Sequence, residues 1–131
     1  MKLALLSLAT AALLGACQGD ETVRAYGGAD RVWLLETLDG APFADRATLT
    51  FPETGRIAGD APCNSYTAAM TAPYPWFDTG PIAATRRSCP ALAAETAYLA
   101  ALDAAALSEV AGDTLILSNT DGLSMVFKAA E

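Results

Sequence analysis

The pattern of hydrophobic and polar positions divides the chain into an apolar leader, a polar segment, a strand-rich stretch and one helix. The leader is residues 1–16, where a single lysine precedes an almost unbroken series of leucine and alanine. A positive charge followed by a short apolar run that ends in small residues is typical of a secretory signal. The run is too short to anchor a bilayer stably, so we predict that residues 1–16 are removed on export.

Short segments that favour β-strands dominate the next part of the chain. Residues 46–51 alternate with period two, which places Ala47, Leu49 and Phe51 on one buried face. Further extended segments are expected at residues 32–38, 56–59, 64–70 and, once or twice, within 74–85. The prolines in the last of these ranges favour a sheet edge or a bend.

Residues 90–107 change to a helical pattern that begins at Pro90, a residue suited to a first helical turn. The narrow apolar stripe of this alanine-rich helix consists of Leu92, Leu99 and Leu102. The stripe and Tyr98 are expected to pack on the sheet. Beyond the helix, residues 113–118 and 123–127 are predicted to pair as strands around an Asp-Gly turn.

The elements together predict an α+β domain at residues 31–131, with one helix packed on a sheet. About 115 residues remain after removal of the leader, which suffices for one small core. A core of this size benefits from a covalent link. Residues 17–30 are polar and include a Gly27-Gly28 pair, so we predict a flexible tether there.

The leader ends in Leu14-Gly15-Ala16-Cys17, which resembles the lipobox of bacterial lipoproteins. The resemblance implies that Cys17 is diacylated, becomes the new N-terminus and anchors the protein in a membrane. Gln18 stands where aspartate favours inner-membrane retention in lipoproteins of enteric type, which implies the outer membrane and a periplasmic domain. The alternative is an ordinary signal peptide that a cysteine follows by chance.

Two cysteines then remain in the exported domain. An oxidising compartment favours a disulfide between Cys63 and Cys89. Closing a loop of about 26 residues stabilises a fold by roughly 3.5 kcal/mol on the chain-entropy estimate. The alternatives are a two-cysteine metal site and a reactive thiol. The chain lacks histidine and a Cys-x-x-Cys spacing, so we expect neither a metal nor a cofactor.

Charge and composition limit the function further. The formal net charge is −7, and removal of Lys2 leaves 7 basic against 15 acidic residues. Nucleic acid is therefore not expected as a partner. Without histidine, a hydrolase would depend on carboxylates such as Asp60, Asp78 and Glu95. The Arg86-Arg87 pair is either an anion site or a solvated face.

Six short motifs in order resemble the META-domain family, the family of the heat-shock protein HslJ and related bacterial lipoproteins. The motifs are Trp33-x-Leu35, Leu49-Thr50-Phe51, Cys63-Asn64-x-Tyr66, Thr85-x-x-x-Cys89, Glu95-x-x-Tyr98-Leu99-x-x-Leu102, and Leu115-x-Leu117 with Gly122-x-x-Met125-x-Phe127. The resemblance implies a compact α+β domain, with an antiparallel, partly barrel-like sheet and one helix packed on it. The chain departs from the family at Pro62 and Ala68, where glycine is usual.

The family resemblance carries over no catalytic residues. Its motif positions include Trp33, Asn64, Tyr66 and Thr85, for which turn capping and core packing are preferred over a role in binding. It implies a non-enzymatic outer-membrane lipoprotein that supports envelope integrity or stress and antibiotic tolerance by binding another envelope component. One alternative is a pilot-like or inhibitor-like lipoprotein that holds a protein at a sheet edge or groove. The other is a small periplasmic hydrolase with two facing carboxylates.

Overall fold

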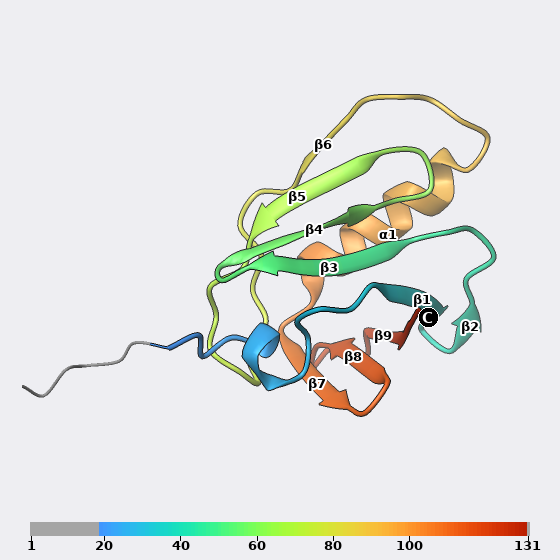
Figure 1. Cartoon of the computed structure of the whole chain (residues 1–131). Helices are drawn as coiled ribbons and strands as arrows, with labels where there is room; N and C mark the ends of the chain where they lie inside the picture. The colour runs from blue at the N-terminus through green and yellow to red at the C-terminus, as the bar shows by residue number, and fades with distance from the viewer. Residues whose placement is uncertain (1–18, 131) are drawn as a thin grey trace, which may run out of the picture.

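A computed structural model describes residues 19–130 (Figure 1). Within this range the chain forms nine strands, one α-helix and one short 3-10 helix. In chain order they are η1 (Val23–Tyr26), β1 (Trp33–Leu38), β2 (Ala41–Pro42), β3 (Thr48–Glu53), β4 (Arg56–Asp60), β5 (Ser65–Ala69), β6 (Ala83–Ala84), α1 (Leu92–Ala104), β7 (Leu107–Ala111), β8 (Thr114–Ser118) and β9 (Ser124–Ala129). No helix in the described range is long and apolar enough to cross a membrane.

The strands form one antiparallel sheet in the order β6-β5-β4-β3-β1-β9-β8-β7, with β2 paired to β1. The helix α1 packs on one side of this sheet, which confirms the predicted α+β class with a single helix (Figure 1). The sheet does not close into a barrel. Instead, the loop after β5 connects opposite sides of the open sheet. It pairs with the residue that follows β5 through the bridge Met70↔Thr79 and with the edge strand β7 through the bridge Trp76↔Leu107.

The core lies between the sheet and α1, and alternation along the strands supplies most of it. On β8 and β9, Leu115, Leu117, Met125 and Phe127 are fully buried, and each lies opposite another member of this set in the register. The predicted apolar face of β3 is also buried. Thr48 is an exception to the alternation, because it is buried although the pattern places it on the polar face.

The predicted helix is confirmed, but it is shorter than the expected 90–107, and its buried face agrees only in part with the predicted stripe. The chain leaves the helix after Ala104, and Leu107 begins β7, a strand that the sequence pattern did not reveal. The buried positions of α1 are Glu95, Tyr98, Ala101 and Leu102. Leu92, which the stripe predicted to be packed, is 43% exposed.

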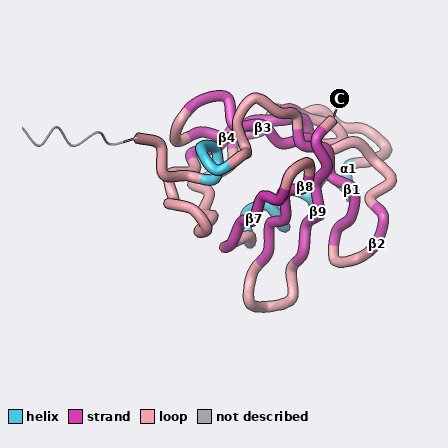
Figure 2. The backbone as a smooth tube through the Cα atoms, turned by 60° about the horizontal axis from the view of Figure 1, so that its bottom comes forward, coloured by secondary structure: helices cyan, strands magenta, loops and turns pink. Residues whose placement is uncertain are grey.

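The expected tether is wrong for residues 20–30, because this part of it is folded against the domain. Val23 is fully buried in η1, and Gly28 accepts a hydrogen bond from the Trp33 indole N–H at 3.0 Å. The Arg24 side chain donates to the Phe51 carbonyl within β3. Figure 2 shows η1 beside β3 and β4. Residues 1–18, with the leader and Cys17, lie outside the described range.

The region between β5 and α1 is less regular than predicted. Of residues 74–85, only Ala83–Ala84 form a strand, and both are exposed at the edge of the sheet. The rest of this stretch crosses from one end of the sheet to the other, as its two bridges require. The predicted strands before and after this region are present with small shifts at their ends.

Candidate functional site

The family-motif residues meet around Glu95, a carboxylate that is only 4% exposed on the inner face of α1. One carboxylate oxygen accepts the backbone N–H groups of Cys63 at 3.0 Å and Asn64 at 2.7 Å. The other accepts the Asn64 side-chain amide at 2.6 Å. Glu95 therefore fixes the turn between β4 and β5 to the helix.

Asn64 extends this network to the segment before the helix. Its side-chain oxygen accepts the Thr85 hydroxyl at 2.9 Å and the Arg87 backbone N–H. Its amide nitrogen also donates to the Arg87 carbonyl at 2.9 Å. A buried polar group is stable only when it is hydrogen-bonded, and both ends of the Asn64 amide are occupied. Asn64 thus links three parts of the chain that are distant in sequence.

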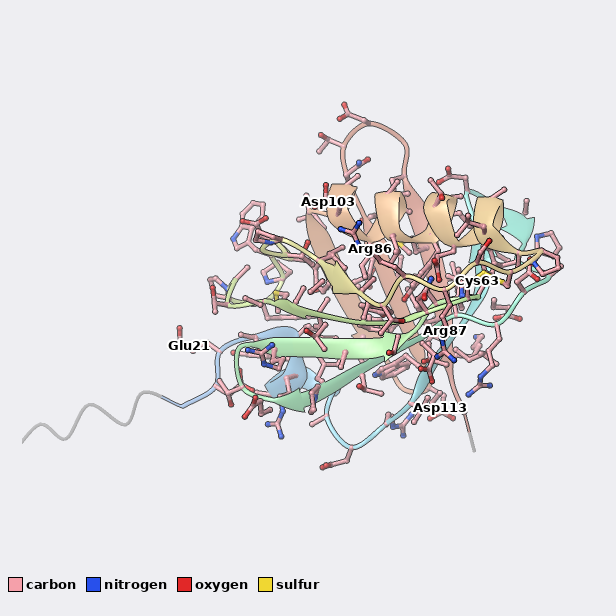
Figure 3. The ribbon with its side chains drawn as sticks, turned by 90° about the horizontal axis from the view of Figure 1, so that it is seen from above. Glu21, Cys63, Arg86, Arg87, Asp103 and Asp113 are labelled. Atoms are coloured by element: carbon pink, nitrogen blue, oxygen red, sulfur yellow. A yellow bond between two sulfur atoms is a disulfide. The ribbon has the colours of Figure 1, made fainter. Side chains whose placement is uncertain are left out.

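The disulfide between Cys63 and Cys89 closes the same corner of the molecule. The Cα atoms are 5.7 Å apart, and the sequence separation is 26 residues. The predicted pairing is therefore confirmed. Figure 3 places Cys63 beside one end of α1 and Asp103 toward the other end. The disulfide and the Asn64–Glu95 network together connect the sheet, the 85–89 segment and the start of the helix.

A second buried centre lies beneath this corner, where two phenols converge on one carbonyl. Tyr66 and Tyr98 are at most 2% exposed, and their hydroxyl oxygens lie 2.7 Å apart. Both hydroxyls also reach the Thr48 carbonyl oxygen, at 2.7 and 3.1 Å. Burial raises the pKa of both phenols above the ordinary value, and for Tyr66 the neighbouring Tyr98 raises the pKa further. Both phenols are therefore neutral, and their two hydroxyl protons serve the three contacts that join Tyr66, Tyr98 and the Thr48 carbonyl oxygen.

Gly59 explains how the two phenols approach the strand so closely. A Cβ atom at this position would lie 2.0 Å from the Thr48 carbonyl oxygen and 2.8 Å from the Tyr66 hydroxyl. Only glycine allows this contact between β3, β4 and β5. Sequence reasoning placed Gly59 in an extended segment and did not reveal that it is part of the Tyr66 environment.

The outer face of the network is a shallow pocket of about 370 Å³. Its lining includes Asn64, Thr85, Glu95 and the Arg86-Arg87 pair. Both arginines are exposed, as in the solvated interpretation of this pair. The polar atoms of Asn64 and Glu95 are already engaged within the protein, so the open groups of this surface include the two arginine side chains and the Ser88 hydroxyl.

The carboxylates considered for a hydrolase are not gathered in this pocket. Glu95 lines it, whereas neither Asp60 nor Asp78 does, and both of these are exposed elsewhere. The two oxygens of Glu95 are occupied by N–H donors. Among residues 19–130, no group of three or more acidic or cysteine side chains is placed to hold a metal ion.

Comparison with protein families identifies the fold. The model of the META domain matches residues 28–131. The chain belongs to the META domain family. No curated protein matches the chain.

Solved structures share the fold of this META domain at low sequence identity. A protein from Burkholderia xenovorans, known from an NMR structure, has a TM-score of 0.63 and 24% identity, over 82% of this chain and 87% of that one. A DUF4847 family protein from Bacteroides vulgatus ATCC 8482, known from a crystal structure, has a TM-score of 0.67 and 13% identity, over 81% and 96%. These likenesses concern the fold alone.

The two departures from the family motif leave the META fold intact. Ala68 is 3% exposed and pairs in register with Ile57 across β4 and β5. Pro62 precedes Cys63 in the turn, and its carbonyl lies 3.9 Å from the Cys89 sulfur. The remaining motif residue, Trp33, is fully buried and donates to Gly28, so its role is to hold the N-terminal segment.

Proposed function

We propose that this META domain protein is a lipid-anchored lipoprotein of the bacterial envelope that acts by binding rather than by catalysis. Cys17 carries the acyl chains, and the domain stands in the periplasm on the outer membrane. There it supports envelope integrity or stress and antibiotic tolerance by holding another envelope component. The support for the anchor is the Leu14-Gly15-Ala16-Cys17 motif directly after an apolar leader.

The observation that carries the non-enzymatic proposal is the internal use of the motif side chains. The side-chain polar atoms of Asn64 and Glu95 are hydrogen-bonded to backbone groups and to each other. Tyr66 and Tyr98 are buried and bond to Thr48, and Cys63 is bonded to Cys89. A catalytic group needs an atom free to reach a substrate, and these groups have a structural task instead. The motif therefore supports a rigid scaffold for surface binding.

The disulfide supports the compartment that we propose. Paired cysteines persist in oxidising environments such as the periplasm, and they are rare in the cytosol. The Cα separation of 5.7 Å lies in the usual range for such a bond. Mature protein isolated from the envelope without reductant should therefore show no thiol that reacts with maleimide at Cys63 or Cys89.

A crosslinking pull-down from intact envelope tests the binding role. Wild-type protein and the Cys17→Ala variant are crosslinked in cells, purified under identical conditions and compared by mass spectrometry. We expect an envelope component that is recovered with the wild type and lost or strongly reduced with Cys17→Ala. Recovery of the same background proteins with both forms would contradict the proposal that an anchored partner complex exists.

A further inference from the structure

Three aromatic side chains that the proposed function does not use are Tyr26 and Trp76, which are exposed, and Tyr74, which is half-buried between Tyr26 and the core. Tyr26 at the end of η1 is 55% exposed and stacks on Tyr74, with ring centroids 4.6 Å apart and an angle of 8° between the planes. Trp76 follows two residues later in the same loop and is 58% exposed. Large aromatic rings with polar edges are enriched where protein meets the membrane–water interface. We call these three residues the aromatic patch.

The aromatic patch lies at the place where the chain enters the domain. The Tyr74 backbone N–H donates to the Glu21 carbonyl at 2.7 Å, which ties the loop to the N-terminal segment. Glu21 is only four residues from Cys17, a stretch that spans at most about 14 Å when fully extended. An acyl chain at Cys17 would therefore hold this loop close to the membrane surface.

The disulfide corner is at the opposite end of the molecule. Figures 1 and 3 are turned about the same horizontal axis, and in both the N-terminal segment approaches from the left. Figure 3 shows Cys63 on the right, beside the end of α1 at which Leu92 stands. The aromatic patch and the disulfide corner, which comprises Cys63, Cys89 and the Asn64–Glu95 network, thus lie at opposite ends of the anchored domain.

The charges near the aromatic patch determine which lipid headgroups the patch can approach without repulsion. Glu21 and Asp78 are exposed next to it in sequence, and Glu109 lines a pocket together with Tyr74. The nearby cation of Arg24 pairs with Asp20 at 3.6 Å. These carboxylates are repelled by anionic lipid headgroups. Zwitterionic headgroups carry no net charge and therefore do not repel them.

We propose that the aromatic patch rests in the headgroup layer of the membrane that holds the lipid anchor, on a zwitterionic glycerophospholipid surface. This inference rests on the proposed lipidation of Cys17. The contact orients the domain, so that the 85–89 segment and the disulfide corner point away from the bilayer. A domain held in one orientation presents the same surface to every envelope partner.

Tryptophan fluorescence tests the contact, because Trp33 is fully buried and Trp76 is the exposed indole. The mature protein is reconstituted in phosphatidylcholine vesicles that carry a spin-label quencher near the headgroup. We expect the Trp76 emission to fall by roughly half and to shift to shorter wavelength, as for an indole at the interface. Trp76→Phe should leave only the unquenched emission of Trp33, whose wavelength also reports that the domain is folded.

A matched variant, Trp76→Phe with Leu92→Trp, moves the exposed indole to the opposite end, where it should escape quenching. Acylated wild type that is quenched no more than this variant would overturn the contact and leave the lipoprotein proposal standing. Mass spectrometry of the same sample reads the anchor separately, and a mature protein without acyl chains would overturn both. Addition of anionic phosphatidylglycerol should reduce the quenching, and stronger quenching would overturn the zwitterionic assignment.

Discussion

Thr48 is the residue on which the buried polar contacts of β3 converge. Its carbonyl oxygen accepts from the phenols of Tyr66 and Tyr98, and its hydroxyl accepts the Asp60 N–H at 2.9 Å. This explains why Thr48 is buried against the period-two pattern. Alternation describes the outer and inner faces of a strand, and it does not foresee a polar side chain that bonds to a neighbouring strand.

Replacing Gly59 tests the close contact at Thr48. Gly59→Ala introduces a Cβ atom 2.0 Å from the carbonyl oxygen, so the strand must shift. We expect a loss of at least about 3 kcal/mol in the free energy of unfolding, measured in urea. Gly80→Ala is the control, because a Cβ atom there meets its nearest neighbour at 3.5 Å, and its effect should stay within about 0.5 kcal/mol. Equal stability of the two variants would contradict this packing.

Glu95→Gln tests the hydrogen-bond network of Glu95 with Cys63 and Asn64. Glutamine keeps the shape but replaces one acceptor by a donor, which would face the N–H groups of Cys63 or Asn64. We expect a loss of about 1–3 kcal/mol in urea unfolding, because a buried donor is left without a partner. Glu109→Gln, at an exposed position of β7, should change stability by less than about 0.5 kcal/mol. A Glu95→Gln protein as stable as the wild type would show that the carboxylate is not required.

The buried phenols predict a loss of stability in alkali. The folded pKa of each phenol lies above its unfolded value of about 10, so the unfolded chain releases protons first as the pH rises. Stability is therefore fully present below about pH 10 and declines above it, by up to about 1.4 kcal/mol per pH unit for each phenol. Urea unfolding at increasing pH should show this decline, and Tyr66→Phe should reduce its slope. Tyr26→Phe, at an exposed ring, is the control, and an equal effect of both variants would count against the buried pair.

At the scale of elements, the helix α1 shows what the sequence could and could not predict. Alanine-rich sequence and Pro90 placed the helix, and alternation with turn residues placed most of the strands before and after it. The leucine stripe predicted the buried face in part, because Leu102 is fully buried and Leu99 packs against the core, whereas Leu92 is exposed. What the stripe missed is Glu95, which is held inward by N–H donors from a distant turn. Hydrophobic periodicity cannot anticipate a buried carboxylate whose partners lie about thirty residues away.

Short strands and packed irregular segments were also beyond the sequence pattern. β2 has only two residues. β7 begins with Leu107, which the sequence pattern placed at the end of the helix. The Gly27-Gly28 pair predicted a flexible tether, whereas Gly27 adopts a left-handed conformation that closes η1 against Val110. In the site, the cysteine pairing followed from composition and compartment, but the links from Asn64 to Thr85 and Arg87 required the folded chain.

The disulfide is the covalent part of the connection between the sheet and α1, and its removal tests that element. The double variant Cys63→Ser, Cys89→Ser should lose up to roughly 3.5 kcal/mol of unfolding free energy, since its unfolded chain is no longer constrained. Wild type treated with reductant should unfold at the same urea concentration as the double variant. A reductant-treated wild type that matches the oxidised protein would contradict a stabilising role for this bond.

At the scale of the whole molecule, the META domain has two ends for which different roles are proposed. The N-terminal end carries the proposed anchor and the aromatic patch, and the opposite end carries the disulfide corner with Arg87, whereas Arg86 lies nearer the middle of the molecule (Figure 3). The acidic surface, with a formal net charge of −7 for the full chain, favours solubility and disfavours phosphate-rich partners. Every function proposed for the domain depends on its being held at a membrane.

Fractionation of the envelope tests that dependence most directly. Wild-type protein and Cys17→Ala are expressed at equal levels, and the membranes are separated from the periplasmic fraction after cell breakage. The account predicts that the wild type sediments with the outer membrane and that Cys17→Ala is either released into the soluble fraction or retained as unprocessed precursor without acyl chains. Processed Cys17→Ala protein that remains with the membranes as the wild type does would contradict the lipoprotein claim.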